Sequence, residues 1–132
     1  MEVEWRRSGS RLLLPIEILR PAPASDLTSL RVTALLDTGA TSSGVAKQVA
    51  DTLALPSIGK EPINTAGGTI LANRYLFRIG FPQDSALPFV FDEITGFELI
   101  AHGAFQAVLG MDVLARCDFS MSRDGHCVLR LV

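Results

Sequence analysis

The chain has 132 residues, of which 48% are hydrophobic and 20% are charged, and its 12 basic and 14 acidic side chains give a net charge of −2. This length favours a single domain over residues 1–132, and the apolar content excludes a disordered chain. The charge balance argues against a strongly basic nucleic-acid-binding protein, so nucleic acid is not an expected partner.

The N-terminal part of the chain predicts an arm followed by two strands. We expect residues 1–10 to form a flexible arm. Residues 11–19 (RLLLPIEIL) are rich in Leu and Ile and predict a strand, and Pro15 favours a sheet edge because proline has no N–H donor. Residues 30–36 (LRVTALL) predict a second strand, in which alternation places the even-numbered side chains on one face.

The rest of the chain alternates short strands with turns. Apolar residues at helical spacing predict a helix over 44–54. The other expected elements are a hairpin of 58–65 and 69–81 around Ala66-Gly67-Gly68, a loop at 82–88, strands at 89–94 and 105–109, helical turns at 111–116, and a hairpin of 117–122 and 126–132. This pattern predicts an all-β fold, mainly β with one or two short helices.

The two cysteines do not predict a disulfide. A three-residue turn at 123–125 would place Cys117 opposite Leu131 and Cys127 opposite Met121 in the C-terminal hairpin. The thiols are therefore expected to be buried or half-buried, and there are too few convergent ligands for a zinc site. No metal and no cofactor is expected.

No segment suggests a membrane partner. No stretch approaches the roughly 20 apolar residues of a membrane span. Pro15 and Glu17 interrupt the apolar run that would otherwise suggest a secretion signal. We expect a cytoplasmic protein.

The segment with the most chemical content is Asp37-Thr38-Gly39-Ala40-Thr41, which follows the predicted strand 30–36. A carboxylate held rigidly at a strand end is a candidate general acid or base. Gly39 is expected to give the turn a backbone conformation that other residues resist. Asp-Thr-Gly alone also occurs in ordinary strand-ending turns, so the motif needs support from the rest of the chain.

That support comes from two later features. A pair of glycines lies at positions 67 and 68, and Val108-Leu109-Gly110 precedes a Met-Asp-Val-Leu run at 111–114. In this order and spacing, the three features resemble the retropepsin-like aspartic proteases, single-domain relatives of pepsin, and especially their bacterial members. The resemblance covers roughly residues 10–132. It implies a closed β-barrel that forms one lobe of the aspartic protease fold per chain.

The resemblance also implies roles for the matching residues. Asp37 would be the catalytic aspartate, Thr38 would reach across to the same loop of a partner, and Gly39 would present its carbonyl to the substrate. The residues near the substrate would be Ala40, Thr41 and Ile70, with Gly67 and Gly68 near the tip of a flap. The residues that support the site would be Val108, Leu109 and Gly110.

The expected activity is that of an aspartic endopeptidase acting on peptide or protein substrates. Two carboxylates held close together share one proton and activate a water molecule between them. Because Asp-Thr-Gly occurs once in the chain, the second carboxylate is expected from Asp37 of another copy in a homodimer. The apolar run 128–132 is a candidate strand for pairing with another chain.

Two positions depart from the retroviral pattern. Retroviral members usually carry an acidic residue two places after the motif glycine and an arginine after the second glycine motif, and these two form an ion pair. Here the positions hold Thr41 and Met111. Since both partners are missing together, we expect a different interaction in place of the ion pair.

Two other functions use the same residues. Asp37-x-Gly39-x-Thr41 also fits the phosphate-binding turn of actin-like ATPases, but those folds need two large lobes and this chain lacks a Walker-type loop. A catalytically silent dimerisation or peptide-binding module with the protease fold is the other alternative. His102 is interpreted as a surface or loop residue and not as a base.

Overall fold

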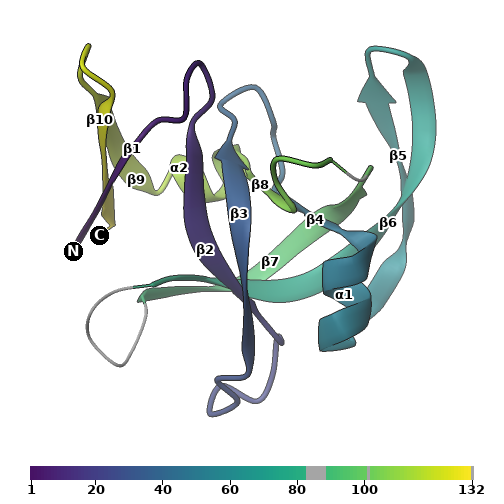
Figure 1. The fold of residues 1–132 in the computed structure, drawn as a ribbon. Coiled ribbons are helices and arrows are strands. Elements are labelled where there is room, and N and C mark those ends of the chain that lie inside the picture. Colours follow the sequence, from purple (N-terminus) through teal and green to yellow (C-terminus); the bar gives the residue numbers. More distant parts are fainter. Residues whose placement is uncertain (83–88, 101, 132) are drawn as a thin grey trace.

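A computed structural model describes residues 1–82, 89–100 and 102–131 (Figure 1). The predicted loop segment 83–88 lies outside the described residues. The elements in chain order are β1 (Glu2–Arg6), β2 (Leu13–Leu19), β3 (Ser29–Leu36), β4 (Gly44–Ala46), α1 (Lys47–Leu53), β5 (Ser57–Thr65), β6 (Gly68–Phe81), β7 (Phe89–Leu99), β8 (Ala107–Leu109), α2 (Met111–Leu114), β9 (Cys117–Met121) and β10 (His126–Leu131). The predicted all-β class, mainly β with one or two short helices, is confirmed, and the described residues form two helices.

The larger sheet has the strand order β2-β3-β8-β4-β7-β6-β5. A further antiparallel pairing joins Glu17–Leu19 of β2 to Arg78–Gly80 of β6, which closes the sheet into a ring with β5 outside it. The expected closed β architecture is therefore present. Pro15 pairs with Thr33 of β3 in the part of β2 that lies before the β6 pairing, so the missing N–H costs no ladder bond there.

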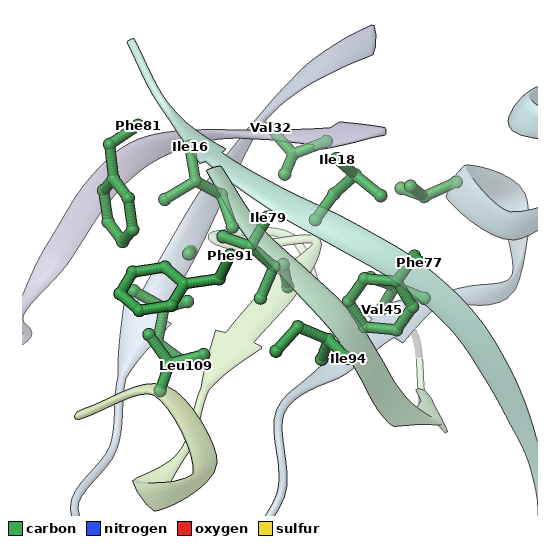
Figure 2. Close-up of a cluster of buried hydrophobic side chains, with 14 of the residues drawn as sticks. Ile16, Ile18, Val32, Val45, Phe77, Ile79, Phe81, Phe91, Ile94 and Leu109 are labelled. Atoms are coloured by element: carbon green, nitrogen blue, oxygen red, sulfur yellow. The ribbon is translucent and has the colours of Figure 1, made fainter. Parts of the chain in front are cut away.

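The interior of the ring is filled by aliphatic and aromatic side chains. The even-numbered side chains of β3 (Val32, Ala34, Leu36) are buried, as their alternation predicts. Figure 2 shows how side chains from several strands meet in this core: Ile16, Ile18, Val32, Val45, Phe77, Ile79, Phe81, Phe91, Ile94 and Leu109. This packed core gives the surrounding strand ends a rigid base.

The predicted boundaries at 44–54 and 89–94 differ most from the structure. The segment 44–54 is not helical throughout, because Gly44–Ala46 form β4 and pair with both β7 and β8; the helix begins at Lys47. The strand expected at 89–94 continues to Leu99, because it pairs with β6 and then with β4. In both cases tertiary pairing overrides the local pattern.

The chain ends form a second sheet of order β1-β10-β9, on the left in Figure 1. Residues 2–6, expected within a flexible arm, instead form β1, because their backbone pairs with His126–Arg130 of β10. Both edges of β10 are thus occupied by strands of the same chain. The prediction that the C-terminal run pairs with another chain is wrong for this strand.

The register predicted for the C-terminal hairpin is confirmed. Cys127 pairs with Met121 and Leu131 pairs with Cys117, and both thiols are free. Cys127 is buried and Cys117 is half-buried. Neither helix in the described part of the chain has the length and apolar character needed to cross a lipid bilayer.

Candidate active site

Asp37 lies where β3 ends, and its backbone is fixed from both sides. The N–H of Leu36 donates to the carbonyl of Leu12 at 2.9 Å, and the N–H of Asp37 donates to the carbonyl of Leu109 at 3.0 Å. The parallel pairing of β3 with β8 places Leu109 directly beside this strand end. The half-buried carboxylate is thus held at the edge of the core and does not sit on a free loop.

The turn after Asp37 is stabilised by the aspartate itself. Asp37 Oδ1 accepts the N–H of Gly39 at 2.9 Å, and the carbonyl of Asp37 accepts the N–H of Ala40 at 3.2 Å. Gly39 does not lie in the left-handed backbone region, so the conformational reason expected for this glycine is wrong. Its Cβ would instead lie 3.2 Å from Asp37 Oδ1, a close approach that a side chain would disturb.

The turn crosses the segment that follows β8 at very short range. A Cβ atom on Gly110 would lie 2.6 Å from the carbonyl carbon of Ser42 and 2.9 Å from the carbonyl oxygen of Ala40. Two backbone hydrogen bonds join the crossing segments, from Met111 N–H to the Ala40 carbonyl at 2.7 Å and from Asp112 N–H to the Thr41 carbonyl at 3.2 Å. Val108-Leu109-Gly110, predicted to support the site, therefore lies directly against the Asp37 turn.

A cavity of about 660 Å³ opens beside the turn. Its walls come from the Asp37 turn, from the β5–β6 hairpin, from the end of β7 and from residues between β7 and β8. The lining residues are Asp37, Gly39, Ala40, Thr41, Ser42, Ser43, Pro62, Ile63, Asn64, Ile70, Phe97, Glu98, Leu99, Ile100, His102, Phe105 and Val108. Such a concave, largely apolar space with a few polar groups is the usual form of a ligand site.

The structure brings together only some of the residues predicted for substrate binding. Ala40, Thr41 and Ile70 line the cavity. Gly67 and Gly68 are exposed at the end of the hairpin, and neither lines the cavity in this single chain. The hairpin turn consists of Ala66 and Gly67, whereas Gly68 already belongs to β6 and has a φ of 117°, a conformation that favours glycine. Thr38 is exposed and is not among the residues that line the cavity.

Sequence reasoning missed an aromatic part of the cavity wall. The rings of His102 and Phe105 stack with centroids 4.3 Å apart, and His102 Nδ1 accepts the N–H of Ala104 at 3.0 Å. His102 is a loop residue, as interpreted from the sequence, yet it also lines the cavity. No periodic pattern could have revealed this, because the stacking depends on how the chain turns between β7 and β8.

Glu98 is the second carboxylate in the cavity lining, and it is engaged by neighbouring groups. Its Oε1 accepts the Tyr75 hydroxyl at 2.6 Å and the Asn73 amide at 3.3 Å. Burial, and then the nearby Glu98 carboxylate, raise the pKa of Tyr75 to about 12. These bonds join Glu98 of β7 to β6 at the base of the hairpin.

Comparisons with known proteins agree with this geometry. The profile of a family described as aspartyl protease matches residues 26–113, which include the Asp37 turn, the hairpin and the crossing segment. The chain belongs to the aspartyl protease family. Family membership and the cavity beside Asp37 together point to a peptide hydrolase. A search of curated proteins finds no significant match.

A solved structure shows the same fold. The retropepsin-like aspartic protease from Rickettsia conorii superposes with a TM-score of 0.67 over 99% of this chain and 91% of that chain, at 18% sequence identity. This likeness establishes a retropepsin-like fold for the protein. The predicted resemblance to bacterial retropepsin-like proteases is thereby confirmed.

Proposed function

We propose that the protein is an aspartic endopeptidase whose active site contains two Asp37 carboxylates, one from each chain of a homodimer. The observation that carries this proposal is the position of Asp37: a half-buried carboxylate, fixed by Leu109 and Gly39, at the wall of an open cavity. In a family of aspartyl proteases, this is the group expected to act on the peptide bond.

The chemistry needs a pair of carboxylates that share one proton. The ionised carboxylate removes a proton from a water molecule, and the resulting hydroxide attacks the carbonyl carbon of the scissile bond. The protonated carboxylate donates its proton to the carbonyl oxygen as the tetrahedral intermediate forms. Proton transfer to the leaving nitrogen then allows the C–N bond to break.

The second carboxylate is best supplied by another copy of the chain. Asp-Thr-Gly occurs once in the sequence. The other carboxylate in the cavity lining, Glu98, is engaged by Tyr75 and Asn73. An isologous two-fold dimer places the same residue of each chain face to face at the axis, which provides the missing Asp37.

The surrounding residues have matching roles in this proposal. The Gly39 carbonyl would accept a hydrogen bond from the substrate backbone, and Thr38, exposed in the single chain, would contact the partner's turn. Ala40, Thr41 and Ile70 would contact substrate side chains. The β5–β6 hairpin, with Gly67 and Gly68 at its end, would act as a flap. A cytoplasmic location stays a prediction.

The test is cleavage of a peptide library by the full chain across acidic to neutral pH. We expect discrete cleavage products from the wild type and none above background from Asp37→Asn. A matched control is Asp51→Asn, which removes an exposed carboxylate that pairs with Lys47 on α1 and lies outside the cavity lining. This control should cleave like the wild type.

Two results would contradict the proposal. Activity that survives Asp37→Asn would show that another group performs the hydrolysis. A folded, dimeric wild type that cleaves no peptide in the library would favour the silent dimerisation or peptide-binding module.

A further inference from the structure

A polar cluster links the end of the Asp37 turn to α2 and consists of Ser43, which also lines the cavity, and the half-buried Asp112. Ser43, the residue just before β4, has no exposed surface. Its hydroxyl donates to Asp112 Oδ1 at 2.7 Å, and its N–H donates to Asp112 Oδ2 at 3.0 Å. The same hydroxyl oxygen accepts the N–H of Gly110 at 3.0 Å. We call Ser43 and Asp112, joined by these bonds, the clamp.

The clamp leaves few of its polar groups unpaired. Asp112 Oδ1 also accepts the N–H of Val113 at 3.0 Å, so the carboxylate receives three hydrogen bonds from neutral donors. No cation of the described residues pairs with Asp112. Asp112 is half-buried, and these donors replace the water that its carboxylate loses. The cluster is therefore a specific arrangement and not an incidental surface contact.

The clamp lies close in sequence to the two positions where the retroviral pattern carries an ion pair. Those two positions hold Thr41 and Met111, and in the structure they contribute only backbone groups to the crossing: the Thr41 carbonyl accepts Asp112 N–H, and Met111 N–H donates to Ala40. The side-chain link between the crossing segments has moved to the neighbouring positions, 43 and 112. This supplies the replacement interaction expected from the sequence.

We propose that Ser43 and Asp112 are positioning residues that hold Asp37 in its catalytic orientation. The turn 37–43 is joined to the segment 109–113 at both ends, by Asp37 N–H to the Leu109 carbonyl and by the clamp at Ser43. Loss of the clamp removes the side-chain link at the second end and leaves only backbone bonds there, so the turn can shift and the bond at the first end opens more often. A displacement of about 1 Å at the reacting group lowers a rate by about 10²-fold. This inference rests on the proposed protease function.

The kinetic test compares three variants with a control of matched stability. We expect Asp112→Ala to lower kcat by about 30–100-fold with KM within about threefold, because most of the cavity wall lies outside the turn that shifts with Asp37. Ser43→Ala should lower kcat by about tenfold. The double variant should be no slower than Asp112→Ala alone, because the two residues act as one unit.

The control separates positioning from loss of stability. Val49→Ala removes buried methyl groups from α1, outside the cavity lining, and lowers the melting temperature without touching the clamp. Its kcat should stay within about twofold of the wild type at a temperature where every variant is folded. An unchanged kcat in folded Asp112→Ala, or an equal drop in Val49→Ala, would overturn the proposal.

A second readout does not depend on activity. In Asp112→Ala the amide protons of Asp37 and Gly110 should exchange with solvent at least tenfold faster than in the wild type, whereas the Leu55 amide, bonded to Ala50 in α1, should be unchanged. If the wild type cleaves nothing, the proposed function fails while exchange still tests the clamp. Equal protection of the Asp37 amide in both proteins would refute the clamp itself.

Discussion

The two sides of the cavity differ in how tightly they are built. On one side the Asp37 turn crosses the segment 108–113, with backbone hydrogen bonds, the clamp and a glycine that has no room for a methyl group. On the other side the β5–β6 hairpin extends from the ring, with Ile70 39% and Leu71 70% exposed (Figure 1). The difference teaches that Asp37 is fixed by packing, while the opposite wall is held mainly by its own strand pairing.

The largest expected effect on stability comes from removing a buried side chain beneath the Asp37 turn. Leu109→Ala should lower the free energy of unfolding by about 2–5 kcal/mol, because Leu109 is fully buried beneath the Asp37 turn. Leu71→Ala, at an exposed hairpin position, should change it by less than about 0.5 kcal/mol. Chemical denaturation of both variants measures the contrast. Similar losses of unfolding free energy in the two variants would mean that the hairpin is packed as firmly as the residues beneath the Asp37 turn.

The next largest effect is expected from adding a methyl group at Gly110, where the Asp37 turn crosses the segment after β8. Gly110→Ala should cost about 2–3 kcal/mol, because its Cβ would meet backbone atoms that cannot move aside alone. The matched control is Gly103→Ala, where no atom lies within 4 Å of the added Cβ. Thermal melting of the two variants is the measurement. A Gly110→Ala protein as stable as its control would show that the segments do not cross at this distance.

Tyr75 marks the base of the hairpin, where β6 joins the core. Its raised pKa, about 12, means that the folded chain retains a phenolic proton that the unfolded chain loses near pH 10. Stability should therefore fall as the pH rises from about 10 to about 12. Because Tyr75 is the one tyrosine in the chain, phenolate absorbance reports it directly.

The Tyr75 titration in the native protein can be compared with the same titration in the denatured protein. In denaturant the midpoint should return to about 10. Glu98→Gln should lower the native midpoint only in part, because burial is the larger cause of the shift. A native midpoint near 10 would show that water reaches the base of the hairpin.

The smallest effect is expected on the hairpin side itself. Ile70→Ala should leave stability within about 0.5 kcal/mol and lower kcat/KM for the best peptide substrate by about tenfold, mainly through KM. The matched variant Leu71→Ala, on the neighbouring position outside the lining, should keep both constants. A drop in kcat alone for Ile70→Ala would place this residue with the reacting groups.

The sequence revealed the parts of the structure that depend on local pattern. The alternation in 30–36 predicted the buried face of β3, and the turn at 123–125 predicted the register of the C-terminal hairpin. The β4–α1 boundary at Lys47 could not be predicted, because Gly44–Ala46 become a strand only by pairing with β7 and β8.

The candidate site shows the same limit. Asp37 and Gly110 were recognisable as motifs, but the reason Gly110 must be glycine is a contact with Ser42, far away in the sequence. The bond between Ser43 and Asp112 likewise joins residues 69 positions apart. Such contacts are set by the path of the whole chain, which no local pattern encodes.

The central claim is that one chain supplies half of an active site. It is tested most directly by refolding wild type and Asp37→Asn together in varied proportions at a fixed total concentration. If each site needs two Asp37 residues, activity falls with the square of the wild-type fraction, to about one quarter in an equal mixture. A linear decline, to about one half, would contradict the account, because it would mean that each wild-type chain works alone.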